Sequence, residues 1–180
     1  MEDKNVSNCS FCGHDSGIEE FKKIWGVENP DSPIWNCLSK VLSLGGVLET
    51  PNSIVFPYVF FVDYPDDIDD WAPSSIMVVT GTNVNVREQP NRTSKIIGQL
   101  SYDIVIIDYE KTYPEQLGKY PFTEANVRMY TDKEWYYVTS TDKKICGYVY
   151  GEYVWSNIGL RIGFDKKGED WKIAWWANGD

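Results

Sequence analysis

The chain has 180 residues, a formal net charge of -10, and eight Trp, twelve Tyr and seven Phe residues. The acidic balance argues against a nucleic-acid partner and against an anionic membrane surface, because both bind through basic residues. It is compatible with a cationic ligand or a basic protein partner, and the 17 Lys and Arg residues are enough to form a local basic patch. No run of apolar residues is long enough to cross a bilayer, so we expect no membrane span.

Residues 1–15 are polar and show little periodicity, which predicts a flexible tail. The segment MEDKNVS at 1–7 has no apolar core of the kind that a signal peptide needs. Two locations therefore stay open. The protein is periplasmic or at the cell surface if an export signal has been removed, and cytoplasmic if Met1 is the true start.

The tail carries a Cys-x-x-Cys pair, Cys9 and Cys12, followed by His14. The pattern resembles one half of a zinc knuckle, but a zinc site needs four ligands and no second Cys-x-x-Cys follows. Three interpretations stay open: an inert or disulfide-forming tail, a metal site, or a redox pair. We expect no cofactor and no metal. The candidate ligands are Cys9 and Cys12, and His14, Cys37 or Asp15 could complete a site. Cys37 and Cys146 lie in apolar patterns and are expected to be buried thiols.

The sequence offers little chemistry for catalysis. His14 is the only histidine, and its position in the tail does not fit a nucleophile and base held together in a folded pocket. No nucleophile elbow, phosphate-binding loop or dinucleotide fingerprint is present. We therefore predict that the chain is not an enzyme.

Residues 16–75 begin with two predicted helices. Ser16 is a plausible N-cap, apolar residues follow at helical spacing, and Gly26 ends the pattern. A second helix is predicted to begin near Pro33, which suits the first position of a helix, and to end at Gly45 and Gly46. The two helices give this region its predicted helical character.

The same region ends with a predicted strand and a linker. Residues 54–62 indicate a strand that Pro57 interrupts, which is typical of an edge strand or a bulge. The acidic stretch at 63–70 lacks the ligand spacing of a calcium loop and predicts an exposed linker.

From residue 76 onward, short apolar runs alternate with turn residues, which indicates the short strands of a barrel or sandwich. In NVNVR at 83–87, Val84 and Val86 share one face of a strand, and Asn83 and Asn85 share the other. Residues 157–180 predict a β-hairpin with a polar turn, packed on one of the two preceding regions.

Four motifs in this part of the chain resemble those of bacterial SH3-like domains, and they occur in the same order. They are TNVNVREQP at 82–90, SKIIGQL at 94–100, WYYV at 135–138 and GYVYGEYV at 147–154. The resemblance covers about residues 76–156 and implies a small SH3-like β-barrel. Members of the family commonly occur in exported bacterial proteins, where they bind cell-wall peptides or proteins.

The sequence departs from the family pattern at 110–134, where the connection between two motifs is longer than usual. The insert carries Tyr113, Tyr120 and Phe122, and it either contributes to binding or covers an apolar surface. The barrel motifs themselves supply a candidate aromatic groove for an extended peptide or a glycan. Its candidate residues are Tyr102, Trp135, Tyr137, Tyr148, Tyr150 and Tyr153.

The sequence therefore predicts an α+β protein: a helical N-terminal region at 16–75, a small SH3-like β-barrel at 76–156 and a C-terminal β-hairpin at 157–180. The predicted function is a non-catalytic binding module for a peptide, either from the cell wall, such as a peptidoglycan fragment, or from a partner protein. The alternative is an acidic inhibitor or immunity-type protein that binds a basic partner, and it follows from the net charge. The oligomeric state is left open.

Overall fold

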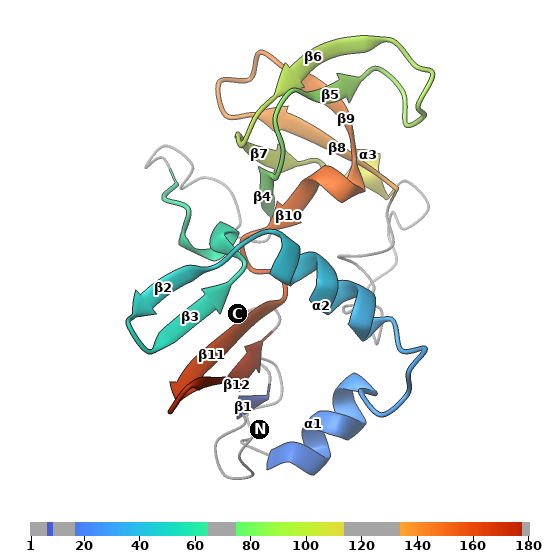
Figure 1. The fold of residues 1–180 in the computed structure, drawn as a ribbon. Coiled ribbons are helices and arrows are strands. Elements are labelled where there is room, and N and C mark those ends of the chain that lie inside the picture. Colours follow the sequence, from blue (N-terminus) through green and yellow to red (C-terminus); the bar gives the residue numbers. More distant parts are fainter. Residues whose placement is uncertain (1–6, 9–16, 65–74, 114–133, 178–180) are drawn as a thin grey trace. The chain divides into compact units, whose positions relative to one another are not determined.

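The structure is a computed structural model that describes residues 7–8, 17–64, 75–113 and 134–177 (Figure 1). The chain divides into two compact units. The first unit combines Met1–Val62 with Ile158–Asp180, and the second is Asp63–Asn157. The described residues form an α+β structure that is mostly β, with one sheet in each unit.

The first unit contains a five-stranded sheet in the order β1-β12-β11-β3-β2. Its strands are β1 (Ser7–Asn8), β2 (Val47–Thr50), β3 (Ser53–Phe56), β11 (Arg161–Lys167) and β12 (Asp170–Ala177). All pairs are antiparallel except β1 with β12. The C-terminal hairpin turns at Gly168, whose φ of 66° suits glycine. Because β11 pairs with β3, the hairpin completes the sheet of the N-terminal region.

Both predicted helices are present in the first unit. The helix α1 (Gly17–Trp25) is followed by Gly26, whose φ of 60° ends the helix. The helix α2 (Ile34–Ser43) buries Ile34, Cys37 and Val41 on one face. Trp25 at the end of α1 packs against Trp176 of β12, with ring centroids 5.3 Å apart. The predicted N-cap Ser16 lies outside the described residues.

The strand predicted at 54–62 is wrong in its second half. After β3 the chain forms a short 3-10 helix, η1 (Tyr58–Phe61), because Pro57 has no N–H for a strand ladder. The strand β3 is also not an edge strand, since it pairs with β11 on one side and β2 on the other. Most of the predicted acidic linker lies outside the described residues.

The second unit contains a seven-stranded antiparallel sheet in the order β10-β4-β7-β8-β9-β5-β6. Its strands are β4 (Ile76–Val79), β5 (Val84–Arg87), β6 (Ile96–Leu100), β7 (Ile104–Ile107), β8 (Trp135–Ser140), β9 (Cys146–Tyr150) and β10 (Val154–Ser156). Two short helices accompany the sheet: α3 (Tyr109–Thr112) and η5 (Gly151–Tyr153). The order leaves β10 and β6 as edges in the described residues, so the sheet is not a closed barrel.

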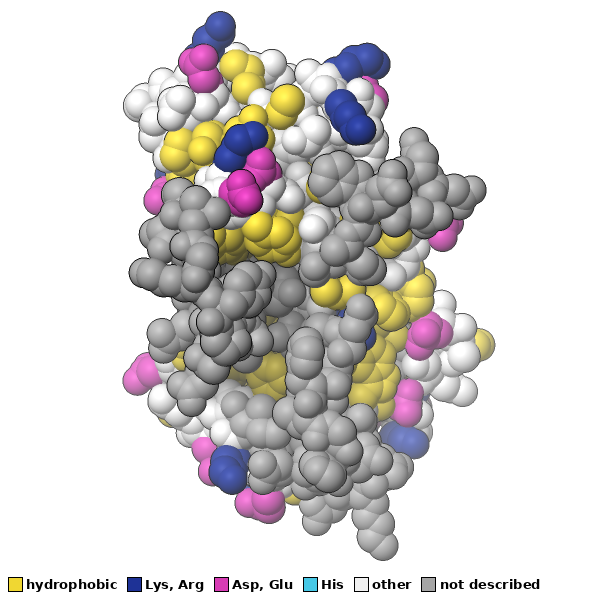
Figure 2. Space-filling model, turned by 180° about the vertical axis from the view of Figure 1, so that it is seen from behind, with side chains coloured by type: hydrophobic (Ala, Val, Ile, Leu, Met, Phe, Trp, Pro, Cys, Tyr) yellow, Lys and Arg dark blue, Asp and Glu magenta, His cyan; other side chains and the backbone are white. Residues whose placement is uncertain are grey.

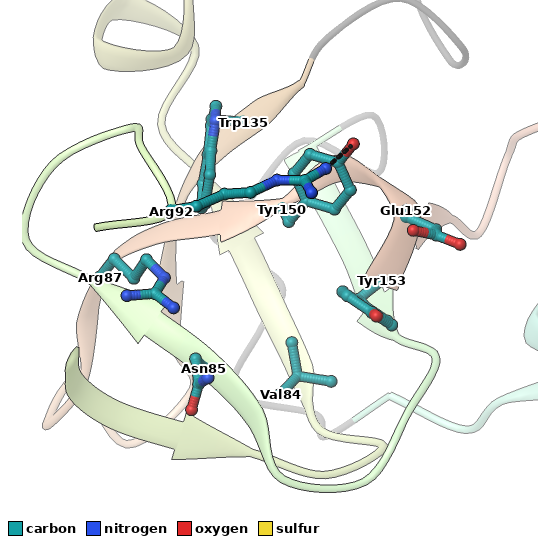
Figure 3. A pocket seen from close by; sticks show the side chains of 8 residues that line it. All are labelled: Val84, Asn85, Arg87, Arg92, Trp135, Tyr150, Glu152 and Tyr153. Atoms are coloured by element: carbon teal, nitrogen blue, oxygen red, sulfur yellow. Dashed lines mark hydrogen bonds between the residues drawn. The ribbon is translucent and has the colours of Figure 1, made fainter. Parts of the chain in front are cut away.

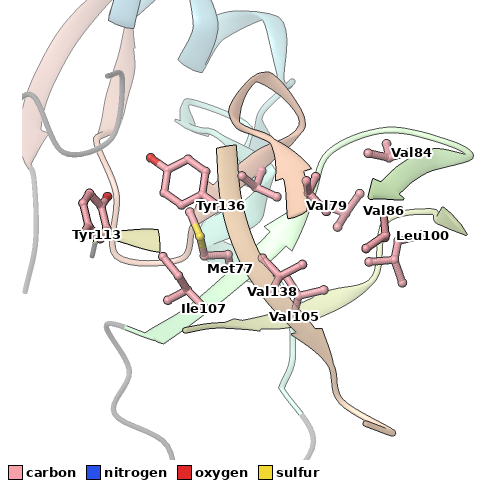
Figure 4. Close-up of a cluster of buried hydrophobic side chains, with 12 residues drawn as sticks. Met77, Val79, Val84, Val86, Leu100, Val105, Ile107, Tyr113, Tyr136 and Val138 are labelled. Carbon is pink, nitrogen blue, oxygen red and sulfur yellow. The ribbon is translucent and has the colours of Figure 1, made fainter. Parts of the chain in front are cut away.

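All seven strands contribute to one buried hydrophobic cluster (Figure 4). Its members are Met77, Val79, Val84, Val86, Leu100, Val105, Ile107, Tyr113, Tyr136, Val138, Val149 and Val154. A sheet whose first and last strands share a core is strongly curved. The predicted burial of Val84 and Val86 on one face of β5 is confirmed.

A close approach between β5 and β9 depends on Gly147. A Cβ at this position would lie 2.6 Å from the carbonyl oxygen of Arg87 and 2.8 Å from Cδ1 of Ile97. Glycine is needed where a backbone approaches this closely. The close packing at Gly147 brings Tyr148 beside Arg87, its partner on β5.

Charged side chains of both signs are interspersed with hydrophobic ones on the face drawn in Figure 2. None of the helices in the described part of the chain is long and apolar enough to cross a membrane.

Candidate functional site

The outer face of strands β8 and β9 carries four aromatic rings in two cross-strand pairs. Trp135 pairs with Tyr150, and Tyr137 with Tyr148. Their ring centroids are 5.3 Å and 5.1 Å apart, and both pairs meet edge to face. Such pairs add about 0.5–1.5 kcal/mol beyond the area that they bury. The rings are therefore held in place before any ligand arrives.

Strand alternation separates these rings from the core. Tyr136 is 3 % exposed and belongs to the buried cluster, whereas its neighbours Trp135 and Tyr137 lie on the outer face and are only partly buried. The same alternation explains Cys146, which was predicted to be buried and is exposed. Cys146 precedes the tightly packed Gly147, so its side chain points to the outer face with Tyr148 and Tyr150.

The first ring pair forms part of a shallow pocket of about 270 Å³ (Figure 3). Tyr153, on η5, extends the aromatic wall, with its ring centroid 6.3 Å from that of Tyr150. Tyr153 is 42 % exposed. The lining residues are Val84, Asn85, Arg87, Arg92, Trp135, Tyr150, Glu152 and Tyr153. The pocket combines three aromatic rings with two cationic side chains and one carboxylate.

Two arginines enter the pocket from β5 and from the turn that follows it. Arg92 lies over the ring of Tyr150, with Cζ 4.8 Å from the ring centroid. Its Nη2 also donates a hydrogen bond of 2.9 Å to the hydroxyl oxygen of Tyr150. Arg87, at the end of β5, donates from Nη1 to the carbonyl oxygen of Ser94 at 2.6 Å. Each arginine is thus held by an uncharged acceptor.

The second ring pair is flanked by the short helix α3. Lys111 lies over the ring of Tyr137, with Nζ 4.3 Å from the centroid, and forms an ion pair of 3.0 Å with Asp108. Asp108 is the N-cap of α3 and accepts a hydrogen bond from the backbone N–H of Lys111. Burial raises the pKa of Asp108, but the hydrogen bonds and charge of Lys111 outweigh it, so the pKa lies below its usual value. The positive charge of Lys111 at this end of the aromatic face is therefore already neutralised by Asp108.

The predicted site residues of the barrel motifs separate into a pocket group, a second ring pair and one residue apart from both. Trp135, Tyr150 and Tyr153 come together in the pocket, and Tyr137 and Tyr148 form the next pair on the same strands. Tyr102 does not line the pocket: it is 57 % exposed in the turn between β6 and β7.

Of the insert candidates, Tyr113 is a core residue and not a surface residue. It is 8 % exposed, belongs to the buried cluster, and stacks on Tyr109 with a centroid distance of 6.1 Å. The other two, Tyr120 and Phe122, lie outside the described residues, as do the candidate metal ligands Cys9, Cys12 and His14. Elsewhere in the described chain, no group of three or more His, Cys, Asp or Glu side chains is placed to hold a metal.

Sequence reasoning missed the polar half of the pocket. Arg87 lines the pocket from the end of β5 and bonds to a backbone oxygen. Arg92 and Glu152 lie in a turn and a 3-10 helix, where no periodic pattern marks their direction. The pairing of β5 with β6 is the feature that could have indicated the position of Arg92, because a hairpin places its turn residues close to the strands that it connects.

A further pocket lies in the first unit. It has a volume of about 550 Å³ and a mostly apolar lining. It is lined by Ile18, Val27, Trp35, Leu38, Phe164, Trp171, Lys172, Ile173 and Trp176. Apart from Lys172 it offers no charged side chain to orient a ligand, so the pocket of the second unit is the better candidate site.

Comparison with protein-family models, curated proteins and solved structures gave no match to this chain.

Proposed function

We propose that residues 76–156 form a non-catalytic, SH3-like binding module, and that its aromatic pocket binds an extended peptide. The observation that carries the proposal is the wall of Trp135, Tyr150 and Tyr153 on the outside of the curved sheet. Aromatic-lined grooves of this kind bind extended peptides by packing against alternate residues. The order of the four sequence motifs and the shared core of all seven strands support the SH3-like assignment.

The size of the pocket supports a peptide over a compact small molecule. Sites for drug-sized ligands are roughly 300–1,000 Å³ and enclose most of the ligand. The pocket has about 270 Å³ and is open to solvent. It suits one or two residues of a longer chain, with the neighbouring Tyr137–Tyr148 pair available for the next part of the peptide.

The rings are also preorganised. Trp135 and Tyr150 are fixed by their cross-strand register, and Arg92 holds the hydroxyl of Tyr150. Binding therefore costs little of the side-chain entropy that a mobile surface loses, about 0.5–1.5 kcal/mol for each immobilised side chain. The alternative of an inhibitor for a basic partner is less favoured at this pocket, because its two arginines would repel that partner.

The test is affinity selection from a pool of random hexapeptides on the immobilised full chain, with retained peptides counted by mass spectrometry. Two matched variants separate the pocket from other exposed tyrosines. Tyr153→Asn removes a pocket ring, and Tyr102→Asn removes an exposed ring that does not line the pocket. Asn tolerates the positive φ of Tyr102, so the control substitution keeps its backbone conformation.

We expect Tyr153→Asn to lower peptide retention about tenfold or more, and Tyr102→Asn to leave it unchanged. The proposal fails if no peptide is retained, or if both variants retain the same amount as the wild type. A cell-wall source is tested separately with the stem peptide Ala-D-Glu-Lys-D-Ala-D-Ala, by following the indole N–H resonance of Trp135. A saturable shift supports a cell-wall ligand. No shift, together with hexapeptide retention, assigns the pocket to peptides of protein origin.

A further inference from the structure

Some cationic side chains in the described part of this acidic chain have a carboxylate partner. Four lysines lie within ion-pair distance of a carboxylate: Lys22 at 3.1 Å, Lys111 at 3.0 Å, Lys144 at 2.8 Å and Lys172 at 3.8 Å. Neither Arg87 nor Arg92 forms an ion pair with any described residue. The same holds for Lys95 and Lys143, which are exposed, but only the two arginines line one pocket together. Arginine is the side chain best suited to pair with a carboxylate, so two arginines in one pocket without a carboxylate partner point to an acidic ligand.

Both guanidinium groups retain most of their hydrogen-bonding capacity. A guanidinium has five N–H groups. Arg92 uses one for the hydroxyl of Tyr150, and Arg87 uses one for the carbonyl oxygen of Ser94. The other N–H groups of both side chains have no acceptor within the described ranges of the chain. They are available to a ligand in the pocket that both arginines line.

The arginines are also fixed. The ring of Tyr150 covers one side of the Arg92 guanidinium, and the hydrogen bond to its hydroxyl limits rotation. Arg87 is partly buried and anchored on the turn at Ser94. A planar fork held in this way matches the two oxygens of a carboxylate and loses little entropy on binding. Lysine would offer only a point charge.

Resting on the peptide-binding function above, we propose that Arg87 and Arg92 bind a carboxylate of the peptide while its neighbouring residue packs on the aromatic wall. The carboxylate is either the C-terminus of the peptide or an Asp or Glu side chain. Glu152 does not conflict with this arrangement. Figure 3 shows it well apart from Arg87, on the Tyr153 side of the pocket.

Three pools of N-acetylated hexapeptides test the proposal on the immobilised full chain. The first has a free C-terminus and no Asp or Glu, so its only carboxylate is terminal. The second has an amidated C-terminus and includes Asp and Glu. The third has an amidated C-terminus without Asp or Glu, and therefore no carboxylate. We expect the third pool to be retained about tenfold less than the better of the other two, because it cannot form charge-assisted hydrogen bonds with the two arginines.

The outcomes separate the two proposals. If the third pool is retained as well as the others and Tyr153→Asn still abolishes retention, the pocket binds peptides but the carboxylate inference is wrong. If no pool is retained, the peptide-binding function itself is wrong. Preference for the first pool over the second identifies a C-terminal carboxylate, and the reverse identifies an acidic side chain.

A matched pair of charge variants adds a second readout. Arg92→Gln and Lys95→Gln each remove one positive charge from the connection between β5 and β6, but only Arg92 lines the pocket. We expect Arg92→Gln to lower retention of carboxylate-bearing pools about tenfold and to leave the third pool unchanged. Lys95→Gln is expected to change no pool. Equal effects of the two variants would reduce the role of Arg92 to general electrostatic attraction and overturn the inference.

Discussion

Gly163 on β11 and Trp175 on β12 are paired across the C-terminal hairpin, and the indole of Trp175 occupies the space of a side chain at position 163. A Cβ there would overlap the indole nitrogen and the ring carbons beside it. The strand pair is irregular between Gly163 and Phe164, which is consistent with a glycine that accommodates a large ring.

We therefore predict that Gly163→Ala lowers the free energy of unfolding of the full chain by about 1–3 kcal/mol, as overpacking does elsewhere. Urea denaturation followed by circular dichroism measures the change. The double variant with Trp175→Ala identifies the cause. If the overlap is responsible, the Gly163→Ala penalty is smaller in the Trp175→Ala background, and an unchanged penalty contradicts this explanation.

A second prediction concerns Thr112, which is 6 % exposed at the end of α3. Its Oγ1 accepts a hydrogen bond of 3.0 Å from the backbone N–H of Tyr137 on β8. Thr112→Val keeps the shape but leaves a partly buried donor without this acceptor, so we expect the free energy of unfolding to fall by about 1 kcal/mol. Hydrogen exchange at the Tyr137 amide is expected to accelerate. Thr112→Ser keeps the hydroxyl, and equal exchange rates in the two variants would rule out the proposed role of this bond.

A third prediction distinguishes two cysteines by alkylation. Burial raises the pKa of the Cys37 thiol to about 11, whereas Cys146 is exposed. The thiolate is the reactive form, so Cys37 has on the order of one thiolate per thousand molecules or fewer at neutral pH. Iodoacetamide at pH 7.5 is expected to modify Cys146 in the folded protein and Cys37 only in urea. Peptide mapping by mass spectrometry resolves the sites, and rapid native labelling of Cys37 would contradict its burial.

A fourth prediction concerns pH and the turn between β8 and β9. The carboxylate of Asp142 accepts hydrogen bonds from the Lys144 ammonium, the Ser140 hydroxyl and the Lys144 backbone N–H, which hold its pKa well below the usual range. Because the folded pKa lies below the unfolded one, the stabilisation is complete above the unfolded pKa and is lost as the pH falls through the folded pKa.

The carboxyl carbon resonance of Asp142, followed by NMR titration, measures this pKa. We expect Lys144→Gln to move the midpoint up toward the ordinary value, because it removes the largest favourable interaction. Lys143→Gln removes a neighbouring charge without that bond and is expected to have little effect. A normal Asp142 midpoint in the wild type would show that the turn does not hold the carboxylate in solution.

The elements that sequence patterns predicted well are those with a clear period. Val84 and Val86 face the core, and Trp135 and Tyr137 lie on the opposite face from Tyr136. These positions are determined by strand alternation, which depends only on the local sequence. The two helices and the C-terminal hairpin follow from the same kind of local pattern and were also found.

What the sequence did not predict depends on contacts between distant residues. Arg92 reaches Tyr150, which lies 58 positions away, only because β5, β6 and β9 lie in one sheet. Tyr113 was a candidate binding residue of the insert, which could also cover an apolar surface, and the structure places it in the core directly after α3. Pro57 signalled a break in a strand, and neither the 3-10 helix after it nor the pairing of β3 with β11 has a local signature.

The first unit is assembled from both ends of the described chain, and this has a consequence for synthesis on the ribosome. The strand β3 at Ser53–Phe56 pairs with β11 at Arg161–Lys167, so it must wait for a strand made about a hundred residues later. All strands of the second unit are completed before β11 emerges. The second unit can therefore fold first, while Trp25 of α1 has no Trp176 to pack against until β12 has been made. Chaperone protection of the nascent chain would matter most during that interval.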